Sequence, residues 1–156
     1  MKTPNFPIFL LRIALGALFL NLGIGKYQEG WLTNSEPLHS SLASYEKTAT
    51  GFQLTYLDQV ALPYANAWSR SICLGELALG ASLLLGCLVR LSTFIGMLFV
   101  LNLYAANGSI YSLKFFGSPM SALLFSSLLL LFFARAGRWG GIDSLFAKSN
   151  SKSLFW

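Results

Sequence analysis

The hydrophobic positions of this chain fall into four long runs separated by shorter polar stretches. The runs cover residues 7–27, 65–88, 92–107 and 118–134. Each is close to the roughly 20 apolar residues that cross a hydrocarbon core as a helix. The pattern therefore predicts an all-α fold, a bundle of four transmembrane helices in a single integral membrane domain over residues 1–156.

One long polar excursion, residues 28–63, separates the first run from the second. It holds four of the six acids of the chain: Glu29, Glu36, Glu46 and Asp58. Its centre has apolar residues at 38, 42 and 45, which is helical spacing, and Gly51 divides it from a second short apolar stretch. We expect one or two short amphipathic helices on the outer membrane surface. An irregular extramembrane loop is the alternative.

The composition excludes a soluble core of this length. The chain is 54% hydrophobic and 11% charged, with a mean hydropathy of +0.58, whereas soluble domains have about 25% charged residues. The net charge is +5, but the basic residues lie at helix ends rather than in a stripe with aromatic residues. This placement indicates contact with the lipid bilayer and its anionic headgroups, and no nucleic acid partner.

The basic residues also predict the orientation. In a four-span topology, seven lysines and arginines lie on the side of the termini and four on the side of the long excursion, which also carries four of the six acids. Basic residues accumulate on the cytoplasmic side, so both termini are predicted to be cytoplasmic. The expected location is a bacterial-type inner membrane, or a thylakoid membrane in a photosynthetic host. A cleaved signal peptide is disfavoured, because Arg12 interrupts its apolar core and no cleavage site follows.

Glu76 is the candidate with the clearest chemical meaning. It lies in an otherwise uncharged, mostly apolar stretch, residues 72–86. A carboxylate in the middle of a membrane helix costs about 3 kcal/mol, so it needs a partner, a polar cavity, a ligand or a proton. Arg12, Asn102 and Asn21 are further polar residues inside the runs, and with Glu76 they are the candidate ligand-binding residues. Two interpretations stay open: a hydrogen-bond network that fixes helix register, or a ligand or proton site.

Small residues predict where helices pack closely. One stripe along the second run contains Ser71, Gly75, Ala78, Ser82 and Gly86. A second stripe beside it contains Ser69, Cys73, Glu76, Gly80 and Cys87. In the first run Gly16 and Gly23 are a heptad apart. Small side chains allow membrane helices to approach closely, and Glu76 is thereby expected to lie between helices.

Other cofactor chemistry has no support in the sequence. Cys73 and Cys87 would lie about 21 Å apart along one helix, too far for a disulfide. The single histidine, His39, has no cysteine or histidine cluster around it, so no metal site is predicted. The chain has no haem, iron–sulfur or flavin motif, and no catalytic residue stands out.

Three segments resemble the DoxX/DoxD-like membrane proteins. They are Leu11-Arg12-Ile13-Ala14-Leu15-Gly16 with Gly25-Lys26, then Gly75-Glu76-Leu77-Ala78-Leu79-Gly80 with Arg90, and Gly137-Arg138 through Gly141-Ile142-Asp143. The long excursion is most similar to the DoxD branch, the small subunit of thiosulfate:quinone oxidoreductase. The resemblance implies a four-helix membrane bundle and assigns no catalytic residue.

The resemblance also implies a function: a membrane subunit in quinone-linked redox chemistry, with sulfur compounds as an electron source. Glu76, with Arg12 or Asn102, would then anchor a quinone headgroup or a proton, and the electrons would require other membrane or redox subunits. The alternative is a non-catalytic accessory or scaffold subunit of a larger respiratory or photosynthetic complex. A small transporter or channel is a third interpretation, disfavoured because only one strong charge, Glu76, is expected deep in the membrane and no pair of discontinuous helices is predicted.

Overall fold

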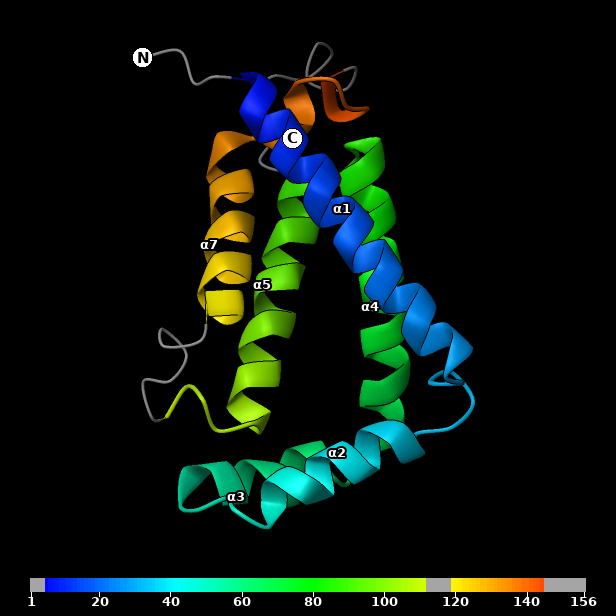
Figure 1. Cartoon of the computed structure of the whole chain (residues 1–156), viewed down its shortest axis with the longest axis vertical. Coiled ribbons are helices and arrows are strands. Elements are labelled where there is room, and N and C mark those ends of the chain that lie inside the picture. Colours follow the sequence, from blue (N-terminus) through cyan, green and yellow to red (C-terminus); the bar gives the residue numbers. More distant parts are fainter. Residues whose placement is uncertain (1–4, 112–118, 145–156) are drawn as a thin grey trace.

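The computed structural model describes residues 5–111 and 119–144, and the regular elements in these residues are all helices. Four long helices stand side by side (Figure 1). They are α1 (Asn5–Gln28), α4 (Ala65–Leu85), α5 (Val89–Ala106) and α7 (Pro119–Ala134). The all-α prediction is confirmed. The closest packing joins α1 to α4 and α5 to α7.

The polar excursion forms a cap across one end of the bundle (Figure 1). It consists of α2 (Glu36–Glu46), α3 (Phe52–Tyr56) and one π-helical turn, η1 (Leu57–Ala61). The buried residues of α2, Leu38 and Leu42, lie four positions apart and therefore on one helix face. They join Leu57 and the first residue of α4 in a small apolar core of their own. The predicted short amphipathic helices are present, and the irregular-loop alternative is not.

Arg12 organises the opposite end of the bundle. Its side chain is fully buried, and its guanidinium donates to three backbone carbonyls that follow α7. Nη1 lies 2.8 Å from the Ala136 oxygen and 3.2 Å from that of Trp139, while Nη2 lies 3.0 Å from that of Gly140. These carbonyls belong to or follow a short 3-10 helix, η2 (Ala136–Arg138). Arg12 thus ties the start of α1 to the segment after the last long helix.

Asp143 caps α5 at the same end. Its carboxylate accepts the backbone N–H of Leu88 at 2.7 Å and of Val89 at 3.0 Å, which are donors that a helix start leaves unsatisfied. Because of this cap, α5 begins at Val89, earlier than the expected residue 92. Helix α4 ends at Leu85, before the expected residue 88, since Gly86 takes a left-handed conformation (φ 67°) that terminates the helix.

Glycines set the distance between α1 and α4, which run antiparallel. A Cβ added at Gly80 would lie 2.5 Å from the backbone nitrogen of Leu20, and one at Gly23 would lie 2.9 Å from that of Leu77. The two predicted small-residue stripes separate onto different neighbours. Cys73 and Gly80 face α1, whereas Gly75 packs beneath Phe99 of α5.

Two of the described helices are long and apolar enough to cross a membrane by length and composition. They are α1, over Phe6–Gln28 with a mean hydropathy of 2.0, and α5, with 1.6. The apolar part of α7, Met120–Ala134, is shorter. Helix α4 has 21 residues but carries Arg70 and Glu76.

The glycine contact makes a direct prediction. Gly80→Ala should lower the free energy of unfolding by about 1–3 kcal/mol, because the new methyl group meets the backbone of α1. Gly25→Ala is the matched control, since a Cβ there meets nothing within 4 Å. It should be neutral or stabilise by up to about 1 kcal/mol through helix propensity. Unfolding of the detergent-solubilised protein measures both. A Gly80→Ala protein as stable as the wild type would contradict the close contact.

Candidate functional site: a capped cavity between the helices

A cavity of about 300 Å³ lies where the cap meets the bundle. Residues from α1, α4, α5 and α7 form its walls, and α2, α3 and η1 close it from the capped end. Most of the lining is apolar, as in sites for small organic ligands. Its polar or aromatic-polar residues are Lys26, Trp31, Ser41, Tyr45, Tyr56, Trp68, Glu76, Asn102 and Tyr104.

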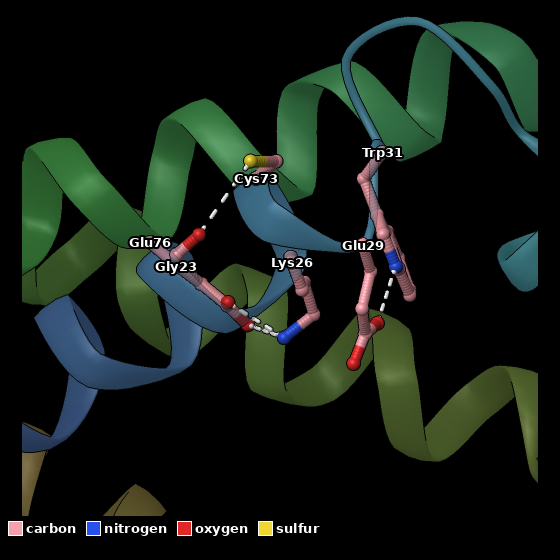
Figure 2. A network of polar contacts seen from close by, with 6 residues as sticks. All are labelled: Gly23, Lys26, Glu29, Trp31, Cys73 and Glu76. Atoms are coloured by element: carbon pink, nitrogen blue, oxygen red, sulfur yellow. Dashed lines mark hydrogen bonds and ion pairs between the residues drawn. The ribbon is translucent and has the colours of Figure 1, made fainter.

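An ion pair between Lys26 and Glu76 forms the most polar part of the wall (Figure 2). The Lys26 Nζ atom lies 2.6 Å from Oε2 and 2.8 Å from Oε1 of Glu76. The side chains are 20% and 14% exposed, so neither is sealed off from the cavity. The pair satisfies the requirement that an intramembrane carboxylate has a partner.

The helix packing brings these two residues together. Lys26 lies near the end of α1, one turn after Gly23, and Gly23 sits directly against Leu77 of α4. Because the two helices are this close, the Lys26 side chain is long enough to reach Glu76 on α4. Trp31 supports the lysine from the other side, with its ring 5.4 Å from Nζ. Trp31 is itself held, since its indole donates to Glu29 at 2.9 Å (Figure 2).

A second polar pair, Tyr56 and Asn102, joins the cap to α5. The Asn102 amide donates to the Tyr56 hydroxyl at 2.7 Å. Burial raises the pKa of the Tyr56 hydroxyl, an effect that the hydrogen bond from Asn102 partly offsets. The hydroxyl therefore stays protonated at neutral pH. Since it already accepts from Asn102, its own proton is available to a third group in the cavity.

The structure brings together two of the four candidate ligand-binding residues. Glu76 and Asn102 both line the cavity. Arg12 lies at the other end of the bundle, bound to backbone carbonyls, and Glu76 pairs with Lys26 instead. Asn21 is exposed on the outer face of α1 and lines no part of this cavity.

The sequence did not identify two polar cavity residues, Lys26 and Tyr56, as site candidates. Lys26 follows an apolar run, a position typical of a lysine that extends to the membrane surface. The signal that could have identified it is its place just after Gly23, since a close helix contact brings the neighbouring turn near α4. Tyr56 lies in the polar excursion, and nothing in its local pattern distinguishes it from other surface aromatics.

The cavity can hold an apolar molecule and contact its polar end. Lys26 and Tyr56 are hydrogen-bond donors, and Glu76 is an acceptor that can also exchange a proton. Cys73, three residues before Glu76 on α4, is fully buried, and its thiol lies 3.7 Å from the Gly23 carbonyl (Figure 2). Cys73 and Cys87 are both free cysteines. This combination of acid, cation and hydroxyl fits a ligand with carbonyl or hydroxyl groups at one end.

The sequence profile of the DoxX family matches residues 8–107. The chain belongs to the DoxX family. The matched residues cover most of α1, the cap, α4 and α5, and they therefore include every described residue that lines the cavity except Leu124 of α7. Arg138 and Asp143 lie beyond the match. No curated protein and no solved structure matches the chain. Family membership and the apolar helices identify an integral membrane protein.

The ion pair predicts non-additive stability changes. Lys26→Met leaves the Glu76 carboxylate without its cation and should lower the free energy of unfolding by about 1–3 kcal/mol. Glu76→Leu should lower the free energy of unfolding by a similar amount, because it leaves the Lys26 ammonium group without its carboxylate. The double variant should lose clearly less than the sum, because no unpaired charge remains. A double-mutant cycle in detergent measures this coupling, and strictly additive losses would show that the pair is not formed.

Proposed function

We propose that this DoxX protein binds a quinone in the capped cavity and acts as a membrane subunit in quinone-linked redox chemistry. The observation that carries the proposal is the cavity itself, about 300 Å³ and mainly apolar, with Lys26–Glu76 and Tyr56–Asn102 in its wall. A quinone ring has two carbonyl oxygens that accept hydrogen bonds, and its isoprenoid tail suits an apolar lining. Lys26 and Tyr56 supply the donors.

The same groups suit the proton side of quinone reduction. A quinone takes up two electrons and two protons to become a quinol. Glu76 lies within reach of the cavity and of Lys26, so this pair can pass protons to the reduced oxygen and regain them from water. The electrons come from a partner subunit. A place in the DoxD branch, with a sulfur compound such as thiosulfate as the electron source, follows from the resemblance of the long excursion.

Binding of a short-chain ubiquinone to the purified protein tests the proposal. Trp31 and Trp68 line the cavity, so quenching of their fluorescence reports occupancy. Asn102→Leu removes the hydrogen bond that orients Tyr56 and should weaken binding about fivefold, the equivalent of one hydrogen bond. Asn21→Leu makes the same change on the outer face of α1 and should leave the affinity unchanged.

A hydrocarbon of matching length without the quinone ring is the ligand control. The polar wall should make the quinone bind clearly tighter than this hydrocarbon. Equal affinities for the two, or equal effects of the two asparagine variants, would contradict a quinone site in the cavity.

The proposal includes a four-span topology with both termini in the cytoplasm. Helices α1, α4, α5 and α7 alternate in direction along the bundle, and the cap closes one end (Figure 1). The arginine-rich end, with Arg12, Arg90, Arg135 and Arg138, would face the cytoplasm.

Reporter fusions check this topology. A reporter inserted within residues 35–55 should report the outer side, because α2 belongs to the cap. A fusion after residue 150 should report the cytoplasmic side. If both fusions report the same side, the four-span topology is wrong, but this result would not contradict the cavity.

An accessory subunit without catalysis is the second candidate. The observation that favours it is Asn21, an exposed amide on α1 with no hydrogen bond to any described residue. Ala14 and Ala17 are exposed on the same face, so another helix could approach closely and satisfy the amide. A larger subunit that co-purifies in equal amounts, together with no quinone binding, would favour this function over the first.

A further inference from the structure

The long helices border the capped cavity unevenly. Two of their leucines line it and yet keep large exposed fractions, Leu22 of α1 at 39% and Leu103 of α5 at 51%. Phe19 and Val100 stand three residues earlier on the same two helices, line the same cavity and are buried. The exposed part of this lining therefore lies at one level, on the capped halves of α1 and α5.

The divergence of the helices toward the cap explains this exposure. Seven residues make almost two helical turns, so residues seven apart point in nearly the same direction. On α1, Leu15 is buried in the core of the bundle, whereas Leu22 is exposed. On α5, Gly96 is buried, and a Cβ there would lie 3.4 Å from Leu128 of α7, whereas Leu103 is exposed. Figure 1 shows α1 leaning away from α7 toward the cap, so helix faces that form the interior at one end separate at the other.

The two leucines belong to surfaces that face lipid rather than water. Helices α1 and α5 are the two described helices that are long and apolar enough to cross a membrane. Leu22 lies about 9 Å before the end of α1 at Gln28, and Leu103 lies about 4.5 Å before the end of α5 at Ala106. Both side chains are therefore within apolar segments, just below the cap. We call the gap bordered by Leu22 and Leu103 the side mouth of the cavity.

The volume of the cavity limits how much of a ligand it holds. Pockets for drug-sized molecules have about 300–1,000 Å³, and this cavity, at about 300 Å³, is at the lower end of that range. It therefore accommodates a ring with its substituents but not a long tail as well. A ring that accepts a hydrogen bond from Lys26 lies next to the side mouth, because Leu22 is one turn before Lys26 on α1.

We propose that the side mouth is a tail-binding subsite: the ring of the ligand lies in the cavity, and its apolar tail passes between Leu22 and Leu103 into the bilayer. This inference rests on the proposed quinone site and assigns it a ligand class, quinones with a tail much longer than the cavity, which enter from the lipid phase. Leu22 and Leu103 then determine the specificity for the tail, while Lys26 and Tyr56 contact the ring.

The cap offers another exposed position in the lining, Ser41 of α2. Its hydroxyl donates to the Pro37 carbonyl at 2.9 Å, so this border of the cavity is polar. A ligand that enters past Ser41 comes from the aqueous side and has no long apolar tail. The two routes therefore predict different ligands and different effects of the same variants.

Native mass spectrometry of the full chain in nanodiscs, titrated with decylubiquinone and with the same ring without a tail, tests the proposal. The double variant with Leu22→Trp and Leu103→Trp fills the side mouth. It should lower the affinity for decylubiquinone about tenfold, because the tail must then pass an overpacked gap. Its affinity for the tailless ring should stay unchanged, which also shows that the variant is folded. Each quinone is compared between protein variants in the same nanodiscs, so its partitioning into lipid cancels.

The double variant with Ile24→Trp and Leu98→Trp is the matched control. These residues lie on α1 and α5 with similar exposed fractions, 42% and 50%, but line no part of the cavity. The control should bind both quinones as the wild type does. Equal losses of the two quinones in the side-mouth variant, or equal losses of decylubiquinone in the two double variants, would overturn the side mouth alone. A wild type that binds neither quinone would instead show that the quinone site itself is wrong.

A photoreactive quinone gives a second measurement on the unaltered chain. With a diazirine on the third carbon of the decyl tail, it should label peptides of α1 and α5 around Leu22 and Leu103, and an excess of the tailless ring should suppress the label. Labelling of α2 around Ser41 instead would show that the tail leaves through the cap, which overturns the side mouth and leaves the quinone site in place. A label that the tailless ring does not suppress would also overturn the side mouth.

Discussion

The contact between α1 and α4 is the constraint on which the rest of this structure depends. Gly23 and Gly80 allow the two backbones to approach so closely that an added methyl group would meet the facing main chain. In a bilayer such packing is driven by dispersion rather than by transfer from water, so the fit must be tight along the whole contact. At one end it brings Lys26 to Glu76. At the other it brings Arg12 beside Gly86, where a Cβ would lie 2.6 Å from Nη1.

The two ends of the contact use buried charge in opposite ways. Arg12 donates to backbone carbonyls and Asp143 accepts from backbone N–H groups, and the fold holds these backbone groups in place. Both side chains are almost completely buried. Such satisfied groups rigidify a fold. Lys26 and Glu76 direct theirs to each other beside a cavity, and each keeps some exposure. A ligand can therefore replace part of this pair without breaking a helix end, which is the property that a binding site needs.

Hydropathy alone was enough to predict the long helices. The backbone N–H and C=O groups of a long apolar run must form hydrogen bonds within that run, and a helix achieves this. Depth along a helix also singled out Glu76 as an acid that needs a partner, and in the structure it is paired with Lys26. The sequence could not identify Lys26 as the partner, because the pairing depends on the register and the crossing angle of α1 on α4. Depth alone made Arg12 a reasonable candidate, but Arg12 binds carbonyls after α7, more than a hundred residues away in sequence. Tyr56 reaches the cavity only because the cap folds back over the bundle.

The cap explains how a membrane protein of this size can keep a carboxylate and a lysine within its helices. Without α2 and α3, the capped end of the cavity would open to solvent and the ion pair would lose the low-dielectric surroundings that strengthen it. The cap is attached to α5 by hydrogen bonds from Gln53 to the Ala106 carbonyl and from Asn102 to Tyr56. The second of these also orients the Tyr56 hydroxyl at the cavity wall. One hydrogen bond thus both closes the cavity and sets the direction of its neutral donor, so the shape of the site and its chemistry cannot vary independently.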